Sequence, residues 1–353
     1  MKIAILGFTK IKYMPYMHFY LDQIDHQEND VHLIYWKRDD NPDSALPDGV
    51  KGHAFDYPMS DALPLRKKVP GILKFGRFAK KALKELRPDF LIVLHSTTGI
   101  SIYRILAAKY KEKYIFDYRD VTYEEIPFYG RMVRRIAENS ALCFTSSDGF
   151  RKYLPSDPGP LTSHNITNVS FRADIASVLP RSKNIPVRIA FWGLLRNQKI
   201  NQAFIEKLGN DDRFELHYYG RAQGSMLSLM EESTKKYKNV FFHGEYKPND
   251  RLEMAKNTDI IHNIFDLNDR TMPIAMSNKY YDGPLFGLPQ LCTKGSLMGS
   301  LCTRYGVGLE CDPFEDDFAE QVYKYYTELD NTAFLKAADK ELARVLTEVE
   351  QGA

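Results

Sequence analysis

The sequence contains few cysteines, and their spacing fits neither a disulfide framework nor a zinc site. The four cysteines among the 353 residues are Cys143, Cys292, Cys302 and Cys311, and no two of them form a Cys-x-x-Cys pair. Disulfide-rich domains and structural zinc sites need denser or more regular spacing than this. We therefore expect reduced thiols in the core of a cytoplasmic protein that binds no zinc.

Long apolar runs are also missing. No window approaches the roughly 18 uninterrupted apolar residues of a membrane-spanning helix. The opening segment 1–7 predicts a buried strand, because it lacks the charged start and the small-residue cleavage site of a signal peptide. With 44% hydrophobic and 13% aromatic residues, the chain has enough apolar side chains for two sizeable cores, so two domains are expected.

The common nucleotide-binding loops are absent as well. Gly7 stands alone after the first predicted strand, without a Walker A loop or a Gly-x-Gly-x-x-Gly fingerprint. Their absence disfavours kinases and dehydrogenases. No loop carries an Asp-x-Asp pair, so we expect neither a divalent metal nor a resident cofactor.

The charge is nearly balanced over the whole chain and strongly basic in one segment. The net charge is +2, yet the segment from Arg66 to Arg87 has seven further lysines and arginines interleaved with apolar residues. Its spacing predicts a helix over 72–86 with Leu73, Phe78 and Leu83 on the apolar side. The basic side is either a solvated helix face or a surface that adsorbs to anionic lipid headgroups. Nucleic acid is not expected as a partner, because no recognition motif accompanies the basic residues.

Apolar runs and helical segments alternate in two rounds, which predicts an α/β fold with mainly parallel sheets covered on both faces. The first round has expected strands at 2–7, 31–36, 52–55, 90–95, 114–118 and 141–145, and expected helices at 14–25, 72–86, 100–110, 128–138 and 148–153. The second round has expected strands at 187–192, 214–219, 240–242, 260–264, 290–293 and 307–310.

A proline-rich and polar stretch separates the two rounds and is the best candidate for a linker. We predict a first doubly wound domain over 1–165, a linker over 166–186 and a second doubly wound domain over 187–325. The C-terminal helix, 326–353, is a candidate to pack back on the first domain. Ligands of such sheets bind at the carboxyl ends of the strands, so a deep cleft between the domains is expected.

A turn with two cations follows the first strand of the second round. Gly193 lets a phosphate approach the backbone, and Arg196 and Lys199 are placed to neutralise a departing diphosphate. Cations after a strand are equally common on plain surfaces. Gly220 ends the next strand in a similar way, and this repetition at successive strand ends is modest support for a ligand site.

The segment 277–289 predicts a short helix whose start carries functional groups. Lys279 and Asp282 lie three residues apart near that start, and Gly287 and Pro289 end the helix before an apolar strand. A helix start that presents a lysine, a carboxylate and backbone N–H groups is able to hold a sugar nucleotide. An ordinary helix-to-strand connection with a surface lysine is the alternative interpretation.

The order of these segments carries a family resemblance. The series 193–199, 219–224, 239–246, 259–263, 278–289 and 304–308 resembles the donor-binding domain of retaining GT-B glycosyltransferases of the family-4 type. More weakly, the segment 117–120 resembles an Arg-Asp segment of capsule and O-antigen transferases of this type. The resemblance implies a GT-B fold of two Rossmann-like domains, a nucleotide-sugar donor with a UDP-sugar favoured, and a glycan or lipid-linked acceptor in bacterial surface polysaccharide synthesis. It also gives the basic helix a role as a peripheral contact with the inner face of the plasma membrane.

The resemblance assigns roles residue by residue. Lys199 matches the diphosphate-binding lysine of the family, and Arg196 replaces an arginine that usually follows the glycine directly. Asp282 falls on the second glutamate of a Glu-x7-Glu motif, which commonly binds ribose, whereas the first glutamate falls on Ile274. The expected catalytic residues are Arg196, Lys199, Asp120 and His95; the expected donor-binding residues are Gly193, Gly220, Asn263, Asp266, Asp269, Asn278, Lys279 and Asp282; and the expected acceptor-side residues are Arg119 and Asp117.

Several of these roles have plainer alternatives. His95 is equally well explained as a satisfied histidine at a strand end, and Arg119 and Asp120 as a mutual ion pair. Because Ile274 is apolar, the missing carboxylate must come from elsewhere, and Asp266 and Asp269 are the available substitutes. The implied reaction is a retaining, metal-independent sugar transfer. A non-catalytic GT-B scaffold subunit and a GT-B epimerase or phosphorylase are the other hypotheses, although no pyridoxal lysine motif stands out.

Overall fold

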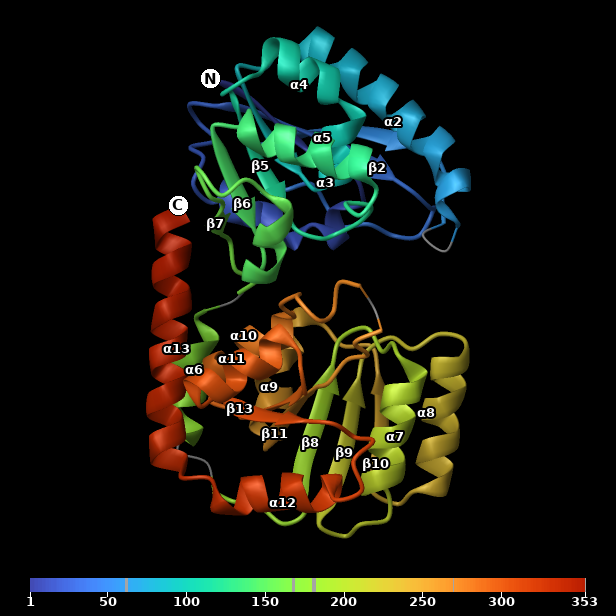
Figure 1. Cartoon of the computed structure of the whole chain (residues 1–353), viewed down its shortest axis with the longest axis vertical. Coiled ribbons are helices and arrows are strands. Elements are labelled where there is room, and N and C mark those ends of the chain that lie inside the picture. The colour runs from blue at the N-terminus through green and yellow to red at the C-terminus, as the bar shows by residue number, and fades with distance from the viewer. Residues whose placement is uncertain (61–62, 167–168, 180–181, 269, 353) are drawn as a thin grey trace. The chain divides into compact units, whose positions relative to one another are not determined.

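The chain folds into two compact units, each built on its own parallel sheet (Figure 1). The computed structural model describes residues 1–60, 63–166, 169–179, 182–268 and 270–352. The first unit comprises Met1–His164 and Glu348–Ala353, and the second comprises Asn165–Thr347. Within the described residues, no helix is both long and apolar enough to cross a membrane.

Seven strands in the order β3-β2-β1-β4-β5-β6-β7 form the sheet of the first unit, and every neighbouring pair is parallel. The strands are β1 (Lys2–Leu6), β2 (Asp30–Lys37), β3 (Val50–Asp56), β4 (Phe90–Leu94), β5 (Tyr114–Tyr118), β6 (Leu142–Thr145) and β7 (Leu161–Thr162). The strands expected from apolar runs are confirmed to within two residues at each end. The two-residue strand β7 was not predicted, because it is too short to show a pattern.

The helices of the first unit depart more from the prediction. They are η1 (Ile11–Tyr13), η2 (Pro15–Met17), α1 (His18–Leu21), α2 (Leu65–Leu86), α3 (Ser96–Ser101), α4 (Tyr103–Lys109), α5 (Pro127–Glu138) and η3 (Asp148–Tyr153). The expected helix 14–25 is wrong: one 3₁₀ turn, Pro15–Met17, and the four α-helical residues His18–Leu21 take its place. Pro15 lies at the start of the 3₁₀ turn, a position that proline tolerates, so it does not account for the early end of the helix at Leu21. The segment 148–153 is likewise a 3₁₀ helix, and 100–110 is divided between α3 and α4.

The basic helix α2 is longer than expected, and a different face of it is buried. It begins before Pro70, which lies in its second turn, where one backbone hydrogen bond is lost. Phe75 and Ala79 form part of its buried face, whereas Leu73 is 57% exposed. Placing Leu73 on the buried side was therefore wrong, because several phases of an apolar stripe fit a helix with so many interleaved leucines and lysines.

Six strands in the order β10-β9-β8-β11-β12-β13 form the sheet of the second unit, again with parallel pairs throughout. They are β8 (Val187–Trp192), β9 (Phe214–Tyr219), β10 (Val240–Gly244), β11 (Ile260–Asn263), β12 (Gln290–Thr293) and β13 (Gly308–Cys311). The helical segments are α6 (Phe171–Ile175), η4 (Ala176–Val178), α7 (Gln198–Leu208), α8 (Ser225–Lys236), η5 (Pro248–Asp250), α9 (Arg251–Lys256), α10 (Asn278–Phe286), α11 (Leu297–Tyr305), α12 (Phe318–Glu328) and α13 (Asn331–Gly352). The α/β class with mainly parallel sheets is confirmed.

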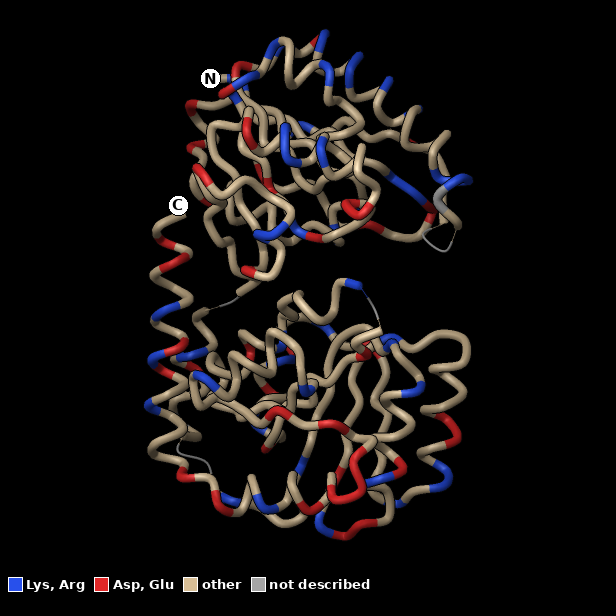
Figure 2. The backbone as a smooth tube through the Cα atoms, viewed as in Figure 1, with Lys and Arg blue, Asp and Glu red and all other residues tan. Residues whose placement is uncertain are grey.

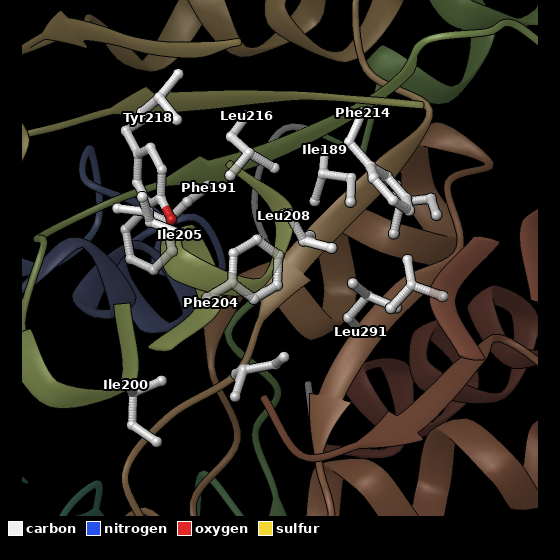
Figure 3. Close-up of a cluster of buried hydrophobic side chains, with 14 of the residues drawn as sticks. Ile189, Phe191, Ile200, Phe204, Ile205, Leu208, Phe214, Leu216, Tyr218 and Leu291 are labelled. Atoms are coloured by element: carbon white, nitrogen blue, oxygen red, sulfur yellow. The ribbon is translucent and has the colours of Figure 1, made fainter. Parts of the chain in front are cut away.

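The largest core cluster of the second unit lies between the sheet and helices α7, α8 and α12. Phe204 of α7 is fully buried and points toward Leu208 and the side chains of β8 and β9 (Figure 3). Its ring stacks on the imidazole of His262 with the ring centres 4.1 Å apart. Burial lowers the pKa of His262 far below its usual value, so this histidine is a neutral core residue.

The last helix, α13, contributes to both units. Its first part packs in the second unit through Phe334, Ala338 and Val345, while the residues from Glu348 onward belong to the first unit. There the Glu348 carboxylate lies 2.7 Å from Nε2 of His164. The segment 166–186, expected as a linker, contains α6, whose Ile175 is fully buried against the second unit.

We expect Phe204→Ala to destabilise the second unit by about 3–5 kcal/mol, because the cavity forms in a fully buried cluster. The free energy of unfolding is measured in urea in a Trp36→Phe background, so that Trp192 alone reports on the second unit. Leu194→Ala, at a side chain 39% exposed, is the matched control and should change stability by under about 0.5 kcal/mol. Equal losses in the two variants would contradict the described core.

Candidate functional site

The candidate donor site lies where the strand order of the second sheet reverses. β8 has β9 on one side and β11 on the other, so the connections leaving β8 and β11 run to opposite sides of the sheet. In open parallel sheets, ligands bind at this switch point, outside the carboxyl ends of the strands. Every expected donor-binding residue that the structure describes lies in this unit, in or next to a loop at that edge or in a helix that starts there.

The loops after β8 and β9 approach each other too closely for any side chain at Gly220. Gly220 has φ +140°, and a Cβ there would lie 1.7 Å from the carbonyl oxygen of Gly193. Hydrogen bonds connect the two loops, from the N–H of Gly193 to Tyr219 (3.0 Å) and from the N–H of Leu195 to Arg221 (3.0 Å). Gly193 and Gly220 therefore shape this edge together, and they leave backbone close to the place where a ligand would lie.

The two expected cations of this edge are exposed. Arg196 lies in the turn before α7, and its backbone carbonyl accepts a hydrogen bond from Asn201. Lys199 is the second residue of α7 and not part of the preceding turn; its Nζ lies 5.3 Å from the ring centre of Phe314. Asn197, with φ 61°, begins this helix without a side-chain cap. Both cations thus accompany an uncapped helix start, which favours anions.

A second uncapped helix start, that of α10, is positioned by Asn263. Asn263 is fully buried at the end of β11 and donates to Gln290 at 3.1 Å. Its Oδ1 accepts the hydroxyl of Ser277 at 2.7 Å, so this N-terminal serine does not cap the helix. The first N–H groups of a helix have no partner within it. The role of Asn263 in the structure is therefore to position the start of α10.

Lys279, in the first turn of α10, is a buried cation. Lys279 is 6% exposed, and its Nζ lies 3.6 Å from the ring centre of Phe191 and 4.6 Å from that of Phe265. Among the described residues, no carboxylate or other acceptor pairs with this ammonium. Burial lowers its pKa to about 7, with Asp282 acting in the opposite direction. A buried ammonium without an anion at an uncapped helix start is the strongest sign of a ligand here.

Asp282 has protein partners for both of its carboxylate oxygens. Arg251, the first residue of α9, donates to one oxygen at 2.8 Å, and the indole N–H of Trp192 donates to the other at 2.8 Å. Asp282 is 4% exposed and Arg251 is 8% exposed, so this is a buried ion pair. Burial raises the pKa of Asp282, which Arg251 and Trp192 oppose. The carboxylate expected to bind ribose holds β8, α9 and α10 together in this structure.

The remaining expected donor-binding residues differ in their exposure and in their contacts. Asn278 is exposed at the first position of α10. Asp266 is half-buried in the loop after β11, and its carboxylate accepts the backbone N–H of Asn268 at 2.9 Å, which makes a local turn. Asp269 lies outside the described residues. Ile274 is half-buried before α10, where a carboxylate was missing from the sequence pattern.

His95 of the first unit lies at the equivalent edge of the other sheet. It follows β4, next to β1, where the strand order of that sheet also reverses. Its φ of 77° is unusual for a residue with a side chain and costs about 1–3 kcal/mol, a strain that tends to cluster at functional sites. Its Nδ1 accepts the N–H of Thr97 at 3.3 Å, and burial lowers its pKa to about 4. The imidazole is therefore neutral with the proton on Nε2.

Arg119 pairs with Asp117 in a buried arrangement. Its Nε lies 2.8 Å from one Asp117 oxygen and 2.9 Å from the other, and its Nη1 donates to the backbone carbonyl of Ser163 at 3.0 Å. The ring of Tyr16 lies beneath the guanidinium at 4.7 Å. Arg119 thus forms a buried ion pair with Asp117, two residues before it. Asp120 is exposed directly after this buried group.

Sequence reasoning did not identify four residues that position this site. Trp192 and Arg251 hold Asp282, while Phe191 and Phe265 flank the ammonium of Lys279. The two aromatic residues at the end of β8 were visible as strand residues, but nothing in their spacing distinguishes a site wall from core. Arg251 lies 31 residues from Asp282, and no local pattern announces such a pair.

We predict that Asp282→Asn lowers the free energy of unfolding by about 3–5 kcal/mol, because Arg251 keeps its buried charge and loses its carboxylate. Chemical denaturation without any ligand measures this change. Asp266→Asn is the matched control, since an amide oxygen keeps the local turn, and it should alter stability by under about 0.5 kcal/mol. If Asp282→Asn unfolded at the same urea concentration as the parent, Asp282 would not be structural.

No protein-family model matches the chain, and a comparison with curated proteins gives no match. Among solved structures, the chain is similar to sucrose-phosphate synthase from Thermosynechococcus elongatus, with a TM-score of 0.70 and 12% identity over 99% of this chain and 94% of that chain. It is also similar to HepE of Anabaena in complex with UDP, with a TM-score of 0.68 and 14% identity over 99% and 98%. A third similar structure is the apo form of the lipopolysaccharide outer core galactosyltransferase WaaB, with a TM-score of 0.62 and 14% identity over 100% and 99%.

At such low identity, the likeness concerns the arrangement of the backbone. These neighbours are GT-B glycosyltransferases. Both of the present sheets are parallel and lie in separate compact units, as that fold requires. The chain therefore has the GT-B fold, with two doubly wound Rossmann-like units.

Proposed function

We propose that this chain is a glycosyltransferase that moves a sugar from a nucleotide-sugar donor to a glycan or lipid-linked acceptor in bacterial surface polysaccharide synthesis. The observation that carries the proposal is the buried ammonium of Lys279 without an anion at the uncapped start of α10. A diphosphate supplies the charge and the acceptors that this place lacks. Similar structures contain UDP or UDP-glucose, which favours a UDP-sugar.

In the proposed reaction, the chain binds the diphosphate and stabilises it as it leaves. Lys279 and the N–H groups at the start of α10 contact the phosphates, and Arg196 and Lys199 add positive charge from the exposed start of α7. Such preorganised charge lowers the barrier most where charge develops. The cations do the work that a divalent metal does elsewhere, so we propose a metal-independent transfer. Retention of configuration is proposed from the family resemblance.

The acceptor-side residues are proposed from the first unit. His95 offers an Nε2–H donor to a sugar hydroxyl, and the exposed Asp120 offers a carboxylate for the proton of an attacking hydroxyl. Asp117 and Arg119 hold the segment that ends in Asp120. We place the enzyme in the cytoplasm, at the inner face of the plasma membrane, where nucleotide sugars meet lipid-linked acceptors.

The first test is a calorimetric titration with UDP, GDP, CMP and dTDP, followed by incubation with the matching nucleotide sugars and purified lipid or glycan acceptors. The proposal expects UDP to bind and the UDP-sugar to release UDP when the acceptor is present, in buffer with excess chelator. A chain that binds UDP and releases none with any acceptor would be the scaffold subunit instead. A chain that binds no nucleotide would overturn the proposal altogether.

The second test uses the pKa of Lys279. Above about pH 7 the free chain holds this lysine neutral, while a bound diphosphate favours the ammonium, so binding takes up a proton. The affinity for UDP should therefore fall roughly tenfold between pH 7 and pH 9, where the terminal phosphate is already fully ionised. Calorimetry in buffers of different ionisation enthalpy measures the proton uptake.

Lys279→Met provides the control for this pH dependence. The variant should bind UDP at least roughly tenfold more weakly at pH 7 and lose the proton uptake, because the titrating group is gone. Lys256→Met, which removes a cation from α9 outside the site, should leave both unchanged. Parent-like affinity and proton uptake in Lys279→Met would show that Lys279 does not contact the bound diphosphate.

A further inference from the structure

A groove of about 680 Å³ lies on the first unit where α2, α5 and the α3–α4 segment meet. Cationic side chains from all three segments line it. They are Arg77, Lys80, Arg104, Arg131 and Arg135. No aspartate or glutamate lines the groove, as far as the structure describes the chain. Lysines and arginines, blue in Figure 2, recur along α2.

These cations lack the partners that other arginines of the chain have. Arg119, Arg188 and Arg213 each pair with an aspartate within 2.9 Å. For the five groove cations, no ion pair or side-chain hydrogen bond occurs within the described part of the chain. Five like charges gathered without counter-charge repel one another. Binding of a polyanion relieves this repulsion and therefore lowers the free energy.

Apolar side chains line the same groove and face solvent. Leu73 of α2 is 57% exposed, and Phe128 in the first turn of α5 is 67% exposed. Ile72 and Met132 lie half-buried between them and the cations. Among the large apolar side chains that the structure describes, Phe128 is the most exposed, ahead of Ile185 (63%) and Met1 (60%). Such exposure of a phenylalanine is costly in water unless a partner covers it.

We infer that this groove is a docking surface for a membrane with anionic phospholipid headgroups. The guanidinium groups of the arginines can each donate two parallel hydrogen bonds to a phosphate. The exposed Leu73 and Phe128 can insert at the boundary between headgroups and acyl chains. A soluble anion would need the arginines and gain nothing from the two apolar side chains. The inference rests on the proposed function, whose lipid-linked acceptor it would bring to the enzyme, and it extends the expected contact from the basic helix to α4 and α5.

Vesicle co-sedimentation of the full chain, without nucleotide, tests this inference. The parent should bind vesicles of phosphatidylglycerol and phosphatidylcholine and release them in 1 M salt, and it should bind pure phosphatidylcholine at least roughly tenfold more weakly. Arg131→Gln/Arg135→Gln should lose roughly tenfold or more in affinity, and Phe128→Ser several-fold. All three side chains are exposed, so thermal unfolding should match the parent.

The matched control is Lys235→Gln/Lys238→Gln, which removes the same charge from exposed positions at the end of α8 and just beyond it. It should bind vesicles like the parent. Equal losses of vesicle binding in the two double variants, or parent-like binding by Arg131→Gln/Arg135→Gln, would overturn the inference that the groove docks on membranes. So would parent-like binding by Phe128→Ser together with release by inorganic diphosphate, which would indicate a soluble anion. UDP calorimetry on the same samples separates this outcome from a failure of the proposed function.

Discussion

The buried carboxylate of Asp282 is the contact on which the candidate donor site depends. It accepts hydrogen bonds from Trp192 at the end of β8 and from Arg251 at the start of α9, and it belongs to α10 itself. One charged side chain thus fixes three elements relative to one another. An ion pair this deeply buried is specific in geometry, because each oxygen is satisfied in one arrangement only. The start of α10, and with it Lys279, is positioned as a consequence.

A second buried acid fixes α10 from its other side. Glu341 of α13 is 1% exposed; it accepts the hydroxyl of Tyr280 at 2.9 Å and pairs with Arg344 at 2.7 Å. Tyr280 directly follows Lys279, so the first turn of α10 is held by contacts on both faces. The ammonium of Lys279 is buried behind this turn, and burial disfavours its charged form, a cost that a bound anion would offset.

The sequence was sufficient for the strands and for the order of the elements, because buried parallel strands are short apolar runs bounded by turn residues. The limits of Tyr114–Tyr118, Val187–Trp192 and Gln290–Thr293 agree to the residue. Helices were harder. The expected first helix, 14–25, is reduced to a 3₁₀ turn and the four residues His18–Leu21, and the leucines of α2 fitted more than one phase, so that Leu73 was placed on the wrong side.

For the candidate site, the sequence indicated positions and did not indicate the contacts that each residue makes. Lys279 and Asp282 were selected by resemblance, and the structure shows that Lys279 is buried between two phenylalanines and that Asp282 belongs to an ion pair. Both facts come from contacts between residues far apart in the chain, such as Arg251 with Asp282, and no periodicity encodes these. Likewise, a pair of Arg119 with Asp120 was one of two interpretations, and the buried ion pair of Arg119 with Asp117, two residues before it, was not foreseen.

Charge pairing offers a way to separate structure from function in this chain. Where cations hold the fold together, as Arg188, Arg213 and Arg251 do, each lies within 2.9 Å of a carboxylate. Lys279 and Arg196 have no such partner among the described residues, and they lie at the edge of the second sheet where a donor would bind. Evenly paired charges need no ligand. Charges without a partner among the described residues, gathered at a strand edge or around a groove, are the basis on which we propose the two anion-binding surfaces.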